Sequence, residues 1–199
     1  MVMTSKKVSK GRLRSLLEGD VDKKQLNLIR KIRGEYLGEA TEVENQLSNV
    51  IAIHFFPGYP FDKTHHDQYR LLESTILGHR SFTFSAKADA LQYILKQSHP
   101  DLYEKYKGTL AKLRKVIEHR NVLAHGYFVQ ELPLPDLLKT QLNRPEQVMV
   151  ETFSKGEVVS HFLTLKDARV KLKEAKDVSD SLGRLWAEIR KQAEEALPN

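Results

Sequence analysis

The sequence predicts a mainly α protein, a bundle of about five helices with a β-hairpin inserted before the C-terminal helix. Two observations lead to this fold class. Apolar residues recur at steps of three and four over most of the 199 residues, which is the period of an amphipathic helix. Between about residues 147 and 165 the pattern changes to two β-rich runs around a short polar connection, which is typical of a hairpin.

Three helices are expected in the first half of the chain. The first runs from residue 21 to about 55 and stops before the prolines and glycine of 57–60, because proline disfavours helix in the residue before it. The second covers about 65–78, with Tyr69, Leu72, Ile76 and Leu77 on its inner side. Ser85 is predicted to be the N-cap of the third, which runs to about residue 97.

Two further helices and the hairpin account for the second half. Pro100 opens a helix that we expect to end at His125, because Gly126 suits the left-handed conformation just past a helix end. A proline-containing connection then leads to strands at 148–153 and 158–164. Thr164 or Lys166 begins the last helix, whose apolar spacing continues to Ile189.

Length and composition predict one domain, residues 21–199, preceded by a basic N-terminal segment, residues 1–20. Since the chain has no cysteine, disulfides, thiolate zinc sites and cysteine nucleophiles are excluded. The most apolar run, residues 50–56, is far shorter than the roughly 20 residues of a membrane-spanning helix. With no secretion signal in the first residues, we expect a cytoplasmic protein that does not enter a membrane.

Positive charge is concentrated at the start of the chain. Residues 1–33 hold ten Lys/Arg against three acidic residues, whereas the whole chain has a formal charge of +6. Such a segment either binds polyanions by counterion release or is a solvated tail. It contains no aromatic residue, so contacts to RNA would be made to phosphates, without sequence specificity. The candidate contacts are Lys6, Lys7, Lys10, Arg12 and Arg14.

Several kinds of catalytic site are missing from the sequence. No glutamate is followed three residues later by histidine, and there is no glycine-rich phosphate loop, Gly-x-Ser-x-Gly or His-Glu-x-x-His motif. Adjacent His65 and His66 would point about 100° apart on a helix, and no cluster of partner ligands is evident. We therefore expect neither a metal site nor a cofactor.

The segment from Arg120 to His125 carries groups suited to phosphodiester cleavage. A guanidinium can stabilise the charge of a pentacoordinate phosphorus, and an imidazole can move protons near neutral pH. The end of a helix favours a protonated imidazole. The alternative is structural: both side chains satisfy carbonyls and carboxylates where the helix ends.

Helix geometry argues that one copy of this segment is an incomplete site. Five residues leave Arg120 and His125 about 140° apart around an ideal helix, whereas Asn121 and His125 share a face. A twofold dimer that brings two such helix ends together would surround a phosphate with two arginines and two histidines. We therefore predict a homodimer with this segment at or beside its interface.

The run Arg120-Asn121-Val122-Leu123-Ala124-His125 resembles the signature of the HEPN superfamily, an arginine and a polar residue followed by three residues and a histidine near the end of a bundle helix. The likeness extends loosely over residues 30–130. It implies a metal-independent endoribonuclease of a toxin–antitoxin or phage-defence system, with RNA as substrate and a cognate antitoxin as a possible partner. Other HEPN proteins are inactive, so a dimeric RNA- or protein-binding module is the alternative.

The resemblance also implies roles for the three residues. Arg120 would stabilise the phosphate, His125 would transfer protons, and Asn121 would bind a phosphate oxygen or position His125. Cleavage would use the 2′-hydroxyl of the RNA and leave a 2′,3′-cyclic phosphate. Glu44 and Asn45 of the first helix are possible neighbours, and we assign no role to them.

Overall fold

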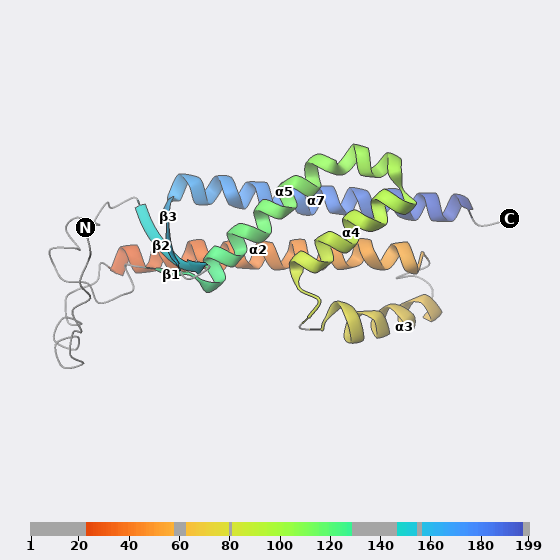
Figure 1. Cartoon of the computed structure of the whole chain (residues 1–199), viewed down its shortest axis with the longest axis horizontal. Helices are drawn as coiled ribbons and strands as arrows, with labels where there is room; N and C mark the ends of the chain where they lie inside the picture. The colour runs from red at the N-terminus through yellow and green to blue at the C-terminus, as the bar shows by residue number, and fades with distance from the viewer. Residues whose placement is uncertain (1–22, 58–62, 80, 129–146, 155–156, 197–199) are drawn as a thin grey trace. The chain divides into compact units, whose positions relative to one another are not determined.

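The computed structural model describes residues 23–57, 63–79, 81–128, 147–154 and 157–196 (Figure 1). The basic segment with Lys6, Lys7, Lys10, Arg12 and Arg14 lies outside them. Five α-helices, one π-helical turn and three strands make up the described part, which confirms a mainly α fold with a hairpin before the last helix. They are α2 (Lys23–Phe55), α3 (Lys63–Leu72), η1 (Glu73–Leu77), α4 (Phe84–Ser98), α5 (Pro100–His125), β1 (Tyr127–Phe128), β2 (Gln147–Ser154), β3 (Glu157–Thr164) and α7 (Leu165–Ala196).

The chain divides into two compact units, which are described separately. Unit 1 comprises residues 1–34 and 121–169, and therefore contains the three strands. Unit 2 comprises residues 35–120 and 170–199 and holds α3, η1, α4 and most of α2, α5 and α7. Whether residues 21–199 act as one domain stays a prediction.

Hydrogen bonds at both ends of unit 2 show that α2 and α5 run in opposite directions. Where α2 enters unit 2, the Tyr36 hydroxyl donates to the Val116 carbonyl in the second half of α5, at 3.4 Å. Near the end of α2, His54 Nδ1 lies 3.1 Å from Nε2 of His99, the residue that precedes α5. The buried side chains between these contacts, among them Leu47, Ile53 and Leu113, form the core.

Helices α4 and α7 are also antiparallel to α5. Arg114 of α5 donates to Asp89 of α4 at 2.8 Å, and the two helices are joined by His99 alone. Tyr106 donates to Glu188 of α7 at 2.8 Å, and Lys171, early in α7, bonds to His119, late in α5. Consequently α2, α4 and α7 run in one direction and α5 in the other.

The second predicted helix differs from its pattern because it ends in a π-helical turn. The turn η1 follows α3 directly and holds more residues per turn than an α-helix, which changes the direction of the side chains after it. Tyr69 and Leu77 are buried as predicted, but Ile76 is 50% exposed, so its assignment to the inner side was wrong.

Capping residues fix the starts of two helices. Thr83, not Ser85, is the N-cap of α4, because its side chain accepts a hydrogen bond from Ala86 N at 3.3 Å. At the start of α7, Thr164 Oγ1 accepts from Asp167 N at 3.0 Å, while Asp167 Oδ2 accepts from Thr164 N at 3.1 Å. This reciprocal pair confirms Thr164 as the start of the last helix.

The hairpin of unit 1 belongs to a three-stranded antiparallel sheet of order β1-β2-β3. Strands β2 and β3 pair from Gln147↔Thr164 to Ser154↔Glu157, as predicted. Strand β1, which was not predicted, pairs Tyr127 with Glu151. One face of the sheet is buried at Val150 and Leu163, whereas the other exposes Tyr127 and Phe162.

A buried ion pair joins α2 to α4. Lys87 is only 7% exposed, and its Nζ lies 2.8 Å from Glu44 Oε1. The Glu44 side chain is 27% exposed and so remains in contact with water. Glu44 is therefore the counter-charge that makes a buried lysine tolerable.

We predict that Glu44→Ala destabilises the protein more than Lys87→Met. Glu44→Ala leaves the buried Lys87 ammonium without a counter-charge and should lower the free energy of unfolding by about 3 kcal/mol. Lys87→Met removes the charge but keeps the buried volume, so the loss should be under about 1.5 kcal/mol. Urea unfolding measures both values. As a control, Glu104→Ala breaks an exposed pair with Lys107 and should leave the free energy of unfolding nearly unchanged. A larger loss for Lys87→Met would contradict this account.

Three side chains connect the ends of α2, α4 and α7. His99 Nδ1 lies 2.8 Å from Gln192 Oε1, which can only accept, so this nitrogen donates. Nε2 of His99 lies 3.1 Å from Nδ1 of His54, so His99 bridges Gln192 and His54. Burial, followed by the neighbouring His99, lowers the pKa of His54, so the fold favours its neutral form.

His54 should make stability depend on pH in one direction. The unfolded chain takes up this proton near pH 6.5 and the folded chain only at lower pH, so the contribution is complete above pH 6.5 and is lost as the pH falls through the folded pKa. In His54→Gln, the decline of unfolding free energy between pH 7 and pH 5 should become shallower by up to about 1.4 kcal/mol per pH unit. The exposed His79→Gln is the control, and an equal change in both variants would refute the prediction.

Candidate functional site

The last two turns of α5 carry the three predicted site residues. Arg120 is half-buried and lies on the same side of the helix as the buried Ile117 and Leu123, which precede and follow it by three residues. Asn121 and His125 are exposed. The division between the units falls after Arg120. The helix therefore presents Asn121 and His125 outward together and turns Arg120 toward the apolar stripe, as expected from their spacing.

Helix α5 ends at His125 as predicted, but the reason for glycine at 126 is different. Gly126 N donates to the Val122 carbonyl at 2.8 Å, and its backbone is not left-handed. A Cβ at this position would collide with that carbonyl oxygen and with Cγ1 of Val150 on β2. Glycine is therefore required by the close approach of β2 to the helix end, and the predicted left-handed conformation was wrong.

An arginine from α2 satisfies one of the last carbonyls of α5. Arg33 Nη2 donates to the Ala124 carbonyl at 3.1 Å, between Asn121 and His125 along the chain. The final carbonyls of a helix have no partner within it, and cations interact favourably with that end. The sequence showed Arg33 only as part of the basic segment, and nothing in its spacing indicated this partner.

A second polar contact precedes the site. Lys171 Nζ donates to His119 Nε2, which brings a cation beside the residue immediately before Arg120. The His119 ring meets the edge of the Tyr36 ring, with centroids 6.3 Å apart. Burial, and then the Glu174 carboxylate, raise the pKa of Tyr36, so its hydroxyl stays protonated and can donate to Val116. These contacts fix the turn of α5 that presents Arg120.

The residues at the opposite end of unit 2 form a separate network without a site residue. Lys105 Nζ lies 2.7 and 2.8 Å from the two carboxylate oxygens of Glu188. This contact, the largest cause, lowers the pKa of Glu188. Burial, and then the hydrogen bond to Glu188, raise the pKa of Tyr106 to about 12. Hydrogen bonds from Lys105 and Tyr106 to Glu188 join α5 to α7 in this network.

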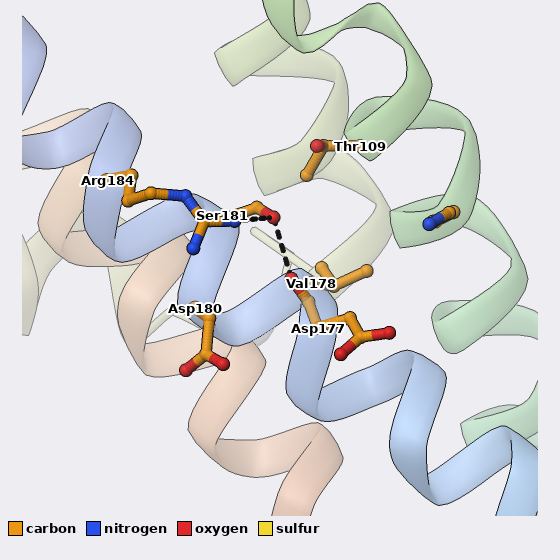
Figure 2. Close-up of a pocket in the computed structure, with 7 residues that line it drawn as sticks. Thr109, Asp177, Val178, Asp180, Ser181 and Arg184 are labelled. Atoms are coloured by element: carbon orange, nitrogen blue, oxygen red, sulfur yellow. Dashed lines mark hydrogen bonds between the residues drawn. The ribbon is translucent and has the colours of Figure 1, made fainter.

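A groove between α5 and α7 in unit 2 has a volume of about 250 Å³ (Figure 2). Ser181 donates to the Asp177 carbonyl at 2.7 Å and accepts from Arg184 at 2.9 Å, so its hydroxyl is satisfied by its own helix. None of the three predicted site residues lines the groove, which is formed by Thr109, Lys112, Asp177, Val178, Asp180, Ser181 and Arg184.

Metal ligands do not gather in the part of the chain that the structure describes. Within it, no group of three or more histidine, aspartate or glutamate side chains could hold a metal ion. Glu44 is paired with Lys87, and Asn45 is exposed. No helix among the described residues is long and apolar enough to cross a membrane.

Comparison with known proteins found no match among family models, curated proteins or solved structures. The candidate site therefore rests on the residues themselves: an exposed Asn121 and His125, and a half-buried Arg120, at the end of one helix.

Gly126→Ala should destabilise unit 1 by about 2 kcal/mol, because a methyl group would overpack the contact with β2. Thermal or urea unfolding measures the loss, and the second substitution Val150→Ala should recover part of it. Gly34→Ala in α2 is the matched control, because a Cβ there meets nothing within 4 Å and alanine favours helix. If Gly126→Ala were as stable as Gly34→Ala, the close-approach explanation would be wrong.

Proposed function

We propose that this protein is a metal-independent endoribonuclease of the HEPN type, acting as a homodimer in which two α5 ends share one phosphodiester. The observation that carries the proposal is the presentation of Asn121 and His125 on an exposed face at the end of a bundle helix, beside a half-buried Arg120. The proposed setting is a toxin–antitoxin or phage-defence system in the cytoplasm, with RNA as substrate and an antitoxin as a further partner.

The chemistry follows from groups that the chain possesses. One His125 takes the proton of the RNA 2′-hydroxyl, whose oxygen bonds to phosphorus. The bond from phosphorus to the 5′-oxygen breaks, and the second copy's His125 gives that oxygen a proton. The products are a 2′,3′-cyclic phosphate and a free 5′-hydroxyl. One imidazole must start neutral and the other protonated, which explains why two copies serve better than one.

The other groups of the segment stabilise the negative charge. Arg120 has a permanent charge and five donors, which suit the oxygens of a pentacoordinate phosphorus. Asn121 shares a face with His125 and can donate to a phosphate oxygen. Arg33 supports the arrangement indirectly, because its bond to Ala124 holds the final turn that presents His125.

Cleavage of RNA in the presence of a chelator tests the proposal. His125→Ala should lower the rate at least about 10²-fold, as expected for loss of a general acid–base, and Arg120→Ala by a similar factor. Lys115→Ala removes an exposed cation from the same helix and should cleave like the unaltered protein. Product ends should be 2′,3′-cyclic phosphates.

Two results would overturn the proposal in different ways. Equal cleavage by all variants would show a contaminating nuclease. Binding of RNA or protein by a dimer that cleaves no RNA would instead favour an inactive HEPN-type module.

A further inference from the structure

Strand β3 forms the outer edge of the sheet in unit 1 and is unusually apolar for an edge. Within the described residues no strand pairs with its outer side. Val158, Val159 and Phe162 are 51%, 40% and 55% exposed. Natural proteins protect such edges with lysine, proline, a bulge or a very short strand. This strand has eight residues, no lysine or proline, and Glu157 as its one acidic residue, so its edge is suited to pairing with another strand.

Charge disfavours RNA as the occupant of this surface. The three strands contain no lysine or arginine, whereas Glu151 and Glu157 are acidic. A surface that binds single-stranded nucleic acid combines aromatic rings with cations that contact phosphates, and the second component is missing from the strands. The edge is therefore better suited to a protein strand.

We infer that the occupant is β3 of a second copy, paired antiparallel with Ser160 opposite its own counterpart. In this register Val158 of each copy lies opposite Phe162 of the other, an aromatic and β-branched pair of the kind that stabilises sheets. Glu157 lies opposite Leu163, so no acidic residue faces its own copy. The small Ser160 occupies the twofold axis, where two identical side chains must fit together.

The backbone alternation agrees with this register. Two residues connect Ser154 to Glu157, and in such hairpins the flanking residues form the hydrogen-bonded pair. Alternate residues of β3, beginning with Val158, then direct their N–H and C=O groups to the open edge. Ser160 and Phe162 are among them. With Ser160 at the centre, the two β3 strands pair over residues 157–163. Centring the pair on Val158 or on Phe162 would leave a shorter paired stretch.

The consequence for catalysis rests on the proposed function. Gly126 lies against Val150 and Thr152, which flank Glu151, and Glu151 is paired with Ser160. The end of α5 is thus level with the twofold axis, beneath β2. Opposite residues of an antiparallel pair keep their side chains on the same face. Two α5 ends would then lie on one face of a six-stranded sheet, three to five strand spacings apart, about 14 to 24 Å, because Gly126 contacts β2 and leads into β1. Both ends would therefore face the same bound RNA.

Cross-linking tests the register directly, because the chain has no cysteine of its own. Under mild oxidation Ser160→Cys should give a disulfide-linked dimer, since directly opposite Cα atoms lie about 5.5 Å apart. Val158→Cys alone and Phe162→Cys alone should remain uncross-linked, because each residue is about 14 Å from its own counterpart. A mixture of Val158→Cys and Phe162→Cys should cross-link.

A second test uses charge and does not depend on oxidation. Ser160→Lys and Ser160→Glu should each raise the dissociation constant of the dimer at least about tenfold, measured by sedimentation, and a mixture of the two should dimerise again. Ile76→Lys, at an exposed apolar residue outside the sheet, is the control.

The outcomes separate this inference from the proposed nuclease. A monomeric chain would overturn the pairing and leave the edge to a strand from another protein. A dimer indifferent to both tests would overturn it as well, although cleavage dependent on His125 would still support the nuclease through another interface. Cross-linking as expected, with no cleavage of RNA, would support the pairing and reject the nuclease.

Discussion

Helix α5 is the element on which the arrangement of unit 2 depends, because α2, α4 and α7 each form hydrogen bonds to it and run opposite to it. Three helices that share one direction cannot all follow one another through short turns. The turn from α4 to α5 is one residue long because those helices are antiparallel. Helices α2 and α4 are instead separated by α3 and η1, which carry the chain from the end of α2 back past Asn49 to the level of Glu44, where α4 begins. The chain also leaves the bundle at the end of α5, where the candidate site lies.

The polar contacts of the bundle differ in how strongly they restrict it. Exposed pairs such as Lys107 with Glu104 join residues of one helix and leave the packing unchanged. The pair of Lys87 with Glu44 is different, because a buried ammonium tolerates only an alignment of α2 and α4 that supplies a carboxylate. The chain of His54, His99 and Gln192 imposes a similar condition at the other end. These two networks therefore restrict the alignment of the helices in addition to the packing of their apolar side chains.

Periodicity predicted the helices well because each buries one apolar stripe, as α5 does through Leu113, Val116 and Ile117. The prediction failed at Ile76, because the extra residue of the π-helical turn rotates the side chains that follow and exposes this one. The spacing of apolar residues does not indicate such a turn.

Strand β1 was missed because two residues are too few to show an alternating pattern. The candidate site residues were predicted from their chemistry and their place at a helix end, and their role stays a prediction. Arg33 was missed because its partner is a carbonyl 91 positions away, which no local pattern reveals. Gly126 was found for the wrong reason, since its neighbour Val150 comes from a distant strand.

Gly126, the single residue between α5 and β1, connects the end of the helix tightly to the sheet. A helix that passes into a strand through a flexible loop is isolated from the movements of the sheet, but Gly126 is held by the Val122 carbonyl on one side and packed against Val150 on the other. The end of α5 and strand β2 are therefore in direct contact, and a displacement of β2 is expected to move the turn that carries Asn121 and His125. Gly126 thus couples the sheet to the candidate site.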